Sequence, residues 1–137
     1  MKIPYVDLKK QYRSEKKNIL KIIDRTLLSG NWVGGKEVEI FEKKISEICN
    51  TKYCVSLNSG TDALTLALHL LGVRRGDEVI TPPNSFIAST AVIVHLGAKP
   101  VFVDVKKDQS IDEDKIEEKI TKKTKAIMPV HLTGRMC

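Results

Sequence analysis

The chain has 137 residues, of which 42% are hydrophobic and 29% are charged, and its formal net charge is +6. This length suits one domain, and the composition supports a hydrophobic core and excludes the signature of a disordered chain. The sequence has no arginine-rich block and no aromatic residues interleaved with lysines, so the charge does not indicate a nucleic-acid-binding protein. A phosphorylated small molecule or another anionic partner is compatible with it.

The cysteines and the N-terminus exclude two further classes. Cys49, Cys54 and Cys137 form no C-x-x-C pair, so we expect neither a disulfide framework nor a zinc site. No apolar run reaches the length of a membrane span, and the first residues lack the apolar segment of a signal peptide. We therefore expect a cytoplasmic protein that does not associate with membranes.

Two amphipathic helices are predicted in the first part of the chain. Apolar residues recur at helical spacing from Tyr12 to Leu27, and Gly30 is expected to end that helix. A polar, glycine-rich stretch follows at 30–35. A second helix is expected to start near Lys36, with Val38, Phe41, Ile45 and Ile48 on one face.

From Tyr53 onward the pattern changes to strands alternating with helices. We predict strands at 53–57, 78–81, 101–105 and 126–130, and helices at 59–71, 86–96 and 112–120. Such alternation implies crossover connections, and hence an α/β fold with a mostly parallel sheet flanked by helices. The helix after Phe86 is apolar nearly all round, which indicates burial on most of its sides.

The segment Asn58-Ser59-Gly60-Thr61-Asp62-Ala63 lies where a strand is expected to meet a helix N-terminus. The first N–H groups of a helix have no internal partner, and the helix dipole is positive there, so this end can hold a phosphate. Gly60 permits close approach, and the hydroxyls of Ser59 and Thr61 add donors. The alternative interpretation is a simple helix cap, because Ser59 followed by Asp62 also resembles a capping box.

A second segment, Thr81-Pro82-Pro83-Asn84-Ser85-Phe86, ends the next expected strand. Open α/β sheets bind ligands at this carboxyl edge, and an aromatic side chain there can stack on a flat ring. A buried core phenylalanine is the other interpretation of Phe86, and the residues alone favour it.

Taken together, these segments resemble the DegT/DnrJ/EryC1/StrS family, which consists mostly of sugar aminotransferases of the fold-type I class that depend on pyridoxal phosphate (PLP). The resemblance runs in order through the chain, over residues 3–8, 29–32, 55–64, 76–86, 97–105 and 124–134. It implies that the chain is the N-terminal part of the large PLP-binding domain. On this basis residues 1–35 form a lead-in, a helix and a glycine-rich loop, and 36–137 form an incomplete large domain.

The family also implies roles for particular residues. Ser59, Gly60 and Thr61 are expected to bind the PLP phosphate, and Phe86 is expected to stack on its pyridine ring. Asn31 and Trp32 are expected near the entrance for the nucleotide-linked sugar. The full-length protein is expected to be a homodimer that takes an amino group from an amino-acid donor, in the biosynthesis of cell-surface polysaccharides or deoxyamino sugars.

The catalytic groups of the family are not expected within these 137 residues. PLP chemistry needs a Schiff-base lysine and a carboxylate facing the pyridinium nitrogen, and in the family both follow the segment around His131. We therefore expect no catalytic residue here and no transferase activity from this piece alone. A PLP-dependent sugar dehydratase and an inactive or regulatory remnant stay open as alternatives, whereas a Rossmann nucleotide module is disfavoured because G-x-G-x-x-G is absent.

Overall fold

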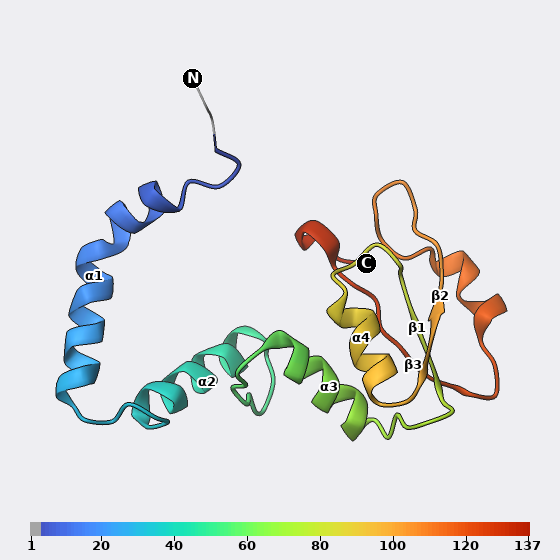
Figure 1. Ribbon diagram of the computed structural model, residues 1–137, viewed down its shortest axis with the longest axis horizontal. Helices are drawn as coiled ribbons and strands as arrows, with labels where there is room; N and C mark the ends of the chain where they lie inside the picture. The colour runs from blue at the N-terminus through green and yellow to red at the C-terminus, as the bar shows by residue number, and fades with distance from the viewer. Residues whose placement is uncertain (1–3) are drawn as a thin grey trace. The chain divides into compact units, whose positions relative to one another are not determined.

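A three-stranded parallel sheet with the order β2-β1-β3 organises the C-terminal part of the chain (Figure 1). Its strands are β1 (Glu78–Thr81), β2 (Lys99–Phe102) and β3 (Thr124–Ile127). All four residues of β1 are buried, because this strand has a neighbour on both sides. The expected α/β class with a parallel sheet is confirmed.

The computed structural model describes residues 4–137; residues 1–3, which belong to the predicted lead-in, lie outside the described residues. The chain divides into two compact units after Ser56, and each is described separately. The predicted division at residue 36, between a lead-in and an incomplete large domain, stays a prediction.

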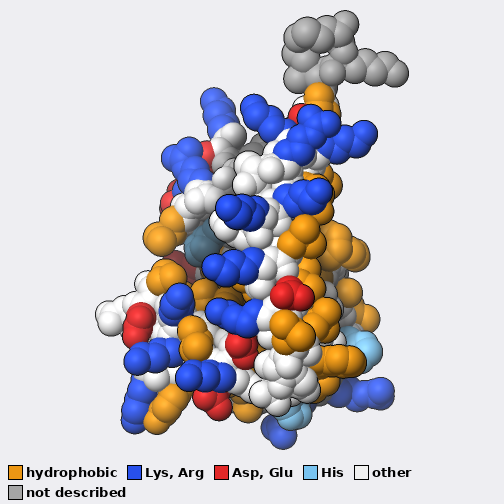
Figure 2. Space-filling view, turned by 90° about the vertical axis from the view of Figure 1, so that its left-hand side faces the viewer, with side chains coloured by type: hydrophobic (Ala, Val, Ile, Leu, Met, Phe, Trp, Pro, Cys, Tyr) orange, Lys and Arg blue, Asp and Glu red, His pale blue; other side chains and the backbone are white. Residues whose placement is uncertain are grey.

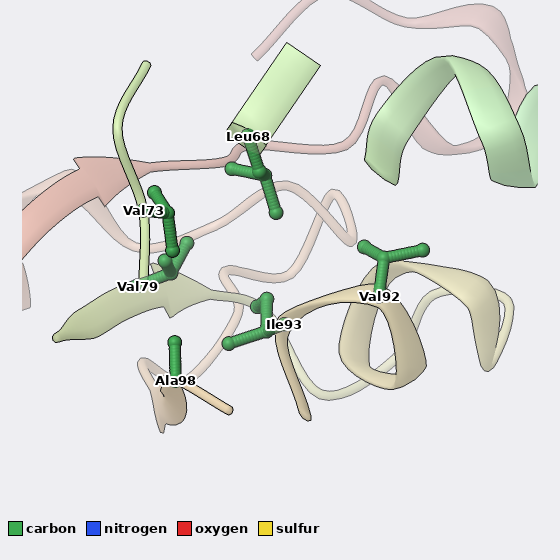
Figure 3. Close-up of a cluster of buried hydrophobic side chains, with 6 residues drawn as sticks. All are labelled: Leu68, Val73, Val79, Val92, Ile93 and Ala98. Carbon is green, nitrogen blue, oxygen red and sulfur yellow. The ribbon is translucent and has the colours of Figure 1, made fainter. Parts of the chain in front are cut away.

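The central strand places neighbouring side chains on opposite faces of the sheet, and both faces are covered. Val79 packs with a cluster formed mainly by α3 (Gly60–Leu70), α4 (Ala88–His95) and the loops that follow these helices (Figure 3). Ile80 packs on the other face against Val103 and Ile111. Burial on both faces agrees with the two adjacent apolar residues of this strand, Val79 and Ile80, which face opposite sides of the sheet. The members of the first cluster besides Val79 are Leu68, Val73, Val92, Ile93 and Ala98.

The predicted element boundaries hold where local signals are strong. The strand at 78–81 matches its prediction, and α3 begins after Ser59, with Gly72 at φ +77° where the helix has ended. The helix α4 begins at Ala88, so Phe86 lies in the turn that precedes it. Only one side of α4 is covered by the described residues: Ile93 is fully buried, whereas Val94 is 57% exposed. The expected burial on most sides is therefore not seen.

The strand predicted at 53–57 is wrong. The segment pairs with no strand among the described residues, and Tyr53 and Val55 are 73% and 74% exposed. A mostly apolar run supplies only a propensity, because a strand exists only when a neighbour accepts its backbone hydrogen bonds. Here the backbone N–H of Ser56 instead donates to Glu42 Oε1, at 2.7 Å.

The helix predicted at 112–120 is replaced by two 3₁₀ turns, η1 (Glu113–Lys115) and η2 (Glu117–Lys119). Ile116 and Ile120 are the only apolar residues in this stretch. Two apolar side chains give no continuous apolar face, and without such packing a short helix is marginal. Ile116 alone reaches the cluster around Ile80.

The first unit contains the two expected helices, α1 (Leu8–Leu28) and α2 (Lys36–Ile48). Asp7 caps α1 by accepting a hydrogen bond from Lys10 N at 3.0 Å, and Gly30 has a φ of +71° just after the helix. No residue between 4 and 56 is buried. These helices are therefore defined by local signals more than by packing.

The surface reflects the positive net charge. On the face drawn in Figure 2, Lys and Arg side chains are spread widely and outnumber Asp and Glu, with hydrophobic side chains exposed between them. No helix in the described part of the chain is both long and apolar enough to cross a membrane.

Glu78 is the charged residue buried in the sheet, and it gives a testable pH dependence. Its Oε2 accepts a hydrogen bond from the Thr121 hydroxyl at 2.6 Å, and Lys99 Nζ lies 3.4 Å from its Oε1. The Thr121 hydrogen bond is the main cause that lowers the pKa of Glu78 below its ordinary value of 4.5; burial opposes it and Lys99 adds to it. A lowered carboxyl pKa stabilises the fold above the unfolded-state pKa, and this contribution disappears as the pH falls through the folded-state pKa.

We therefore expect Glu78→Gln to reduce the free energy of unfolding at pH 7. The difference from the parent chain should shrink as the pH falls below about 4.5, the ordinary pKa of this group. Urea unfolding followed by circular dichroism at several pH values measures it. A difference that stays constant from pH 7 to pH 3 would contradict the role of the Glu78 charge.

Candidate functional site

The N-terminus of α3 presents free backbone donors. Ser59 is the N-cap, with extended backbone angles of φ −153° and ψ 156°. Its Oγ accepts a hydrogen bond from Asp62 N and donates one to Asp62 Oδ2, both at 3.1 Å. The N–H groups of Gly60 and Thr61 have no acceptor among the described residues. The cap predicted at Ser59 is therefore present, and it leaves two amides available to a ligand.

A hollow opens beside this helix end, and it brings three of the predicted site residues close together. Its volume is about 480 Å³, within the range of pockets that hold small molecules. Phe86 is 76% exposed, so it is not the core phenylalanine of the alternative interpretation. The lining residues are Gly60, Thr61, Leu64, Phe86, Ala88 and Ser89.

The electrostatics of the hollow come from the backbone. None of its lining residues carries a charge, so the positive end of the α3 dipole and the free amides of Gly60 and Thr61 are the features that favour an anion. A Cβ added at Gly60 would meet no atom of the described residues within 4 Å, so there is open space beside this residue. The Ser59 hydroxyl proton is already directed to Asp62, so in this conformation Ser59 acts as a cap.

Three lining residues were missed by the sequence reasoning: Leu64, Ala88 and Ser89. Leu64 follows Gly60 by four residues, which places both on the same face of α3, so helical spacing was a usable signal. Nothing in the sequence pattern indicates Ala88 and Ser89, because their place depends on how α4 packs against α3.

Asn31 and Trp32 lie in the other unit, which is described separately. Trp32 is 71% exposed and its Nε1 donates to the backbone carbonyl of Leu27 at 3.1 Å. Asn31 N donates to Ser29 Oγ at 3.2 Å. Both residues therefore have defined local contacts, and their expected role at a substrate entrance stays a prediction.

Comparison with known proteins shows which family this chain belongs to. The model of the DegT/DnrJ/EryC1/StrS aminotransferase family matches residues 13–137, which is most of the chain. The chain belongs to this family. The resemblance noted in the sequence is thereby confirmed, and the fold expected from it agrees with the parallel sheet and its flanking helices.

Individual relatives show how much of the family's length is covered. A dTDP-3-amino-3,6-dideoxy-alpha-D-galactopyranose transaminase from Aneurinibacillus thermoaerophilus is 45% identical over 136 residues, which are 98% of this chain and 38% of that protein. The structure of NtdA from Bacillus subtilis with bound cofactor PMP matches with a TM-score of 0.94 at 38% identity, covering 99% of this chain and 32% of that one. DesV from S. venezuelae, solved in complex with a ketimine intermediate, matches with a TM-score of 0.93 at 40% identity, covering 98% of this chain and 37% of that one.

The family implies PLP, and the residues of the hollow fit the phosphate end of that cofactor. Two free amides at a helix N-terminus suit a phosphate, and the exposed ring of Phe86 lines the same hollow. No lysine or carboxylate lines it. Bound PLP supplies an electron sink for amino-group transfer, and it needs a Schiff-base lysine and a carboxylate for that chemistry. The described residues contain no group of three or more side chains that could hold a metal ion.

Proposed function

We propose that this chain forms the cofactor-phosphate side of the active site in a PLP-dependent aminotransferase that acts on a nucleotide-linked keto-sugar. One observation carries the proposal: the free amides of Gly60 and Thr61 and the exposed ring of Phe86 line one hollow. The chain covers 38% of the length of the transaminase from A. thermoaerophilus. We therefore propose the activity for a protein as long as these relatives, of which this chain forms one part.

Each residue of the hollow has a defined task in this proposal. The amides of Gly60 and Thr61 donate to the phosphate oxygens, where the positive end of α3 favours negative charge. Ser59 and Asp62 cap the helix and so hold those amides in place. Phe86 covers one face of the pyridine ring and excludes water from it.

The sugar and the amino donor are proposed by analogy with the relatives. The A. thermoaerophilus relative is named for a dTDP-linked amino sugar, and another from Pseudomonas aeruginosa, 41% identical, is named UDP-2-acetamido-2-deoxy-3-oxo-D-glucuronate aminotransferase. We therefore propose a nucleotide-linked keto-sugar as acceptor, an amino acid as donor and a homodimer as the assembled form. Asn31 and Trp32 are proposed to contact the sugar nucleotide.

The phosphate site can be tested by ligand binding alone, without measuring amino-group transfer. Pyridoxamine phosphate (PMP) carries an amine in place of the aldehyde, so it cannot react with the exposed lysines of this chain. We expect this chain to bind PMP at least about 10-fold more tightly than pyridoxamine, because hydrogen bonds to a charged group contribute about 1.5–3 kcal/mol each. Equilibrium dialysis of both compounds against the purified chain measures the difference.

Equal affinity for PMP and pyridoxamine would show that the N-terminus of α3 does not hold the phosphate. Raising the salt concentration gives a second check, since chloride and added phosphate should compete with PMP and leave the binding of pyridoxamine unchanged. Activity of a relatives-length protein with a keto-sugar nucleotide and glutamate then tests the transferase itself.

A further inference from the structure

The turn between β1 and α4, which carries Phe86, is held by one side chain. Asn84 Nδ2 donates to the backbone carbonyl of Gln109 at 3.0 Å and lies 3.3 Å from Gln109 Oε1. These two residues are 25 positions apart, so the contact joins the loop after β1 to the loop after β2. It spans the carboxyl edge of the sheet, where open α/β sheets place their ligands.

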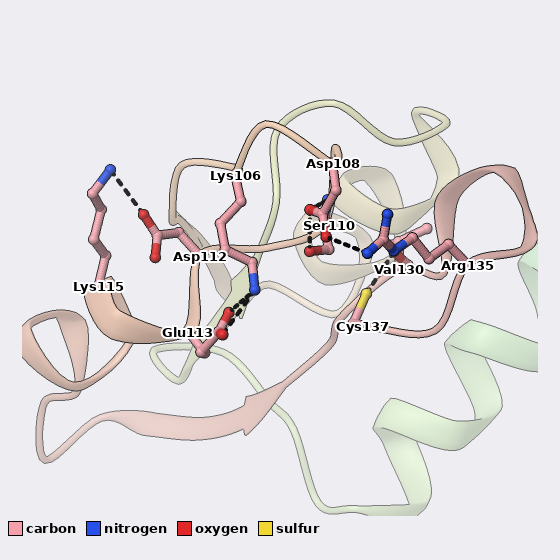
Figure 4. Close-up of polar contacts among 9 residues, drawn as sticks. All are labelled: Lys106, Asp108, Ser110, Asp112, Glu113, Lys115, Val130, Arg135 and Cys137. Carbon is pink, nitrogen blue, oxygen red and sulfur yellow. Dashed lines mark hydrogen bonds and ion pairs between the residues drawn. The ribbon is translucent and has the colours of Figure 1, made fainter.

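The acceptor of this contact belongs to a loop that is closed by its own hydrogen bonds. Gln109 has a φ of +71°, and the loop is closed by a hydrogen bond from Lys106 N to Ser110 O at 2.9 Å. Asp108 Oδ1 accepts hydrogen bonds from both N and Oγ of Ser110, and the guanidinium Nη2 of Arg135 lies 3.5 Å from Asp108 Oδ2 (Figure 4). The Ser110 hydroxyl is the main cause that lowers the pKa of Asp108 below its ordinary value.

The orientation of the Asn84 amide follows from its surroundings. Both atoms of Gln109 that it meets are acceptors, so only the NH₂ group of Asn84 can face them. Its Oδ1 is consequently buried, and no described residue donates to it. A buried acceptor without a donor costs free energy. This cost offsets part of what the two Nδ2 contacts with Gln109 contribute to the stability of the fold.

Phe86 depends on its turn for position. Its side chain is 76% exposed, so packing does not fix the ring, and the backbone of the preceding turn must do so. Pro82 and Pro83 restrict that backbone on one side, and Asn84 anchors it two residues before Phe86. The ring then lines the hollow beside Gly60 and Thr61.

We propose that Asn84 is a positioning residue for the cofactor ring: it ties the Phe86 turn to Gln109 and so holds the aromatic side chain beside the phosphate site. This inference rests on the proposed function, because it takes Phe86 to stack on the pyridine ring. It predicts that Asn84 affects ligands that have a ring and leaves the phosphate site itself intact.

The test compares PMP with inorganic phosphate in parent and variant chains. Phe86→Ala removes the ring contact, and we expect about 3- to 10-fold weaker PMP binding from the loss of stacking. Asn84→Ala should weaken PMP binding by a similar factor and leave phosphate binding, followed through the Gly60 amide signal by NMR, unchanged. Asn84→Ser is the second variant, for use if Asn84→Ala folds poorly. Serine leaves no buried amide oxygen and is too short to reach Gln109, so this variant should behave like Asn84→Ala.

The double variant decides whether Asn84 acts through Phe86. In a Phe86→Ala background, Asn84→Ala should cause no further loss of PMP affinity, because the ring that it positions is gone. Gln109→Asn is the matched control: asparagine tolerates the positive φ, and the backbone carbonyl that accepts from Asn84 remains, so PMP affinity should stay near that of the parent chain.

Three results would overturn the inference: parent-like PMP binding by Asn84→Ala and Asn84→Ser, an equal loss of phosphate binding, or full additivity with Phe86→Ala. If Phe86→Ala itself leaves PMP binding unchanged, the stacking role fails and the inference fails with it. The phosphate role of α3 is judged separately, by the comparison of PMP with pyridoxamine.

Discussion

Replacing Gly60 with proline is expected to weaken PMP binding roughly 10- to 100-fold while leaving the fold intact. Proline has no N–H, so the variant removes one donor to the phosphate, and a hydrogen bond to a charged group contributes about 1.5–3 kcal/mol. Gly60 is the first residue of α3, a position that favours proline, and Ser59 already has the extended backbone that proline requires of its predecessor. Equilibrium dialysis with PMP measures the loss.

Gly60→Ala is the matched control for this variant. It adds a Cβ at a point where nothing lies within 4 Å, and it keeps the N–H. We therefore expect PMP affinity close to that of the parent chain. If Gly60→Pro and Gly60→Ala bind PMP equally well, the Gly60 amide does not hold the phosphate and the proposed site is wrong.

A large loss of stability is expected from Ile93→Ala. Ile93 is fully buried in the cluster that joins α3 and α4 to one face of the sheet (Figure 3). Truncating a buried isoleucine removes its transfer free energy and leaves a cavity, which together cost about 2–5 kcal/mol. Because this cluster also fixes α4 against α3, partial unfolding of the variant should abolish PMP binding as well. Urea unfolding followed by circular dichroism gives the change in free energy.

The adjacent residue offers the control for that experiment. Val94 is 57% exposed on the same helix, so Val94→Ala should change the free energy of unfolding by no more than about 0.5 kcal/mol. Comparable losses from Ile93→Ala and Val94→Ala would mean that the cluster around Ile93 does not hold this unit together.

Local signals predicted the N-terminus of α3 well. Ser59, Gly60 and Asp62 together define a helix start from sequence, and the cap, the free amides and the helix that follows are present in the structure. For Phe86 the residues left two interpretations, a core residue or a ring in a binding site. Its exposure and its place beside Gly60 depend on the packing of α4, which no local pattern encodes.

The errors share one physical cause. The segment 53–57 has the composition of a strand but no partner among the described residues, and 112–120 has the composition of a helix but too few apolar residues to pack one. In both cases the propensity was estimated from neighbours in the sequence, whereas the outcome depended on contacts with distant residues. The contact between Asn84 and Gln109 could not be predicted for the same reason, because 25 positions separate the two residues in the sequence.

By itself, the sequence determined the parallel α/β class and the family, through the order of motifs along the chain, and the capped start of α3 and the strand at 78–81, through residues a few positions apart. Only the tertiary structure decided the strand order β2-β1-β3, the hollow shared by Gly60, Thr61 and Phe86, and the tie between Asn84 and Gln109. Helix starts and apolar runs are fixed by local hydrogen bonding and hydrophobicity, whereas a site assembled from several loops exists only once distant segments have packed.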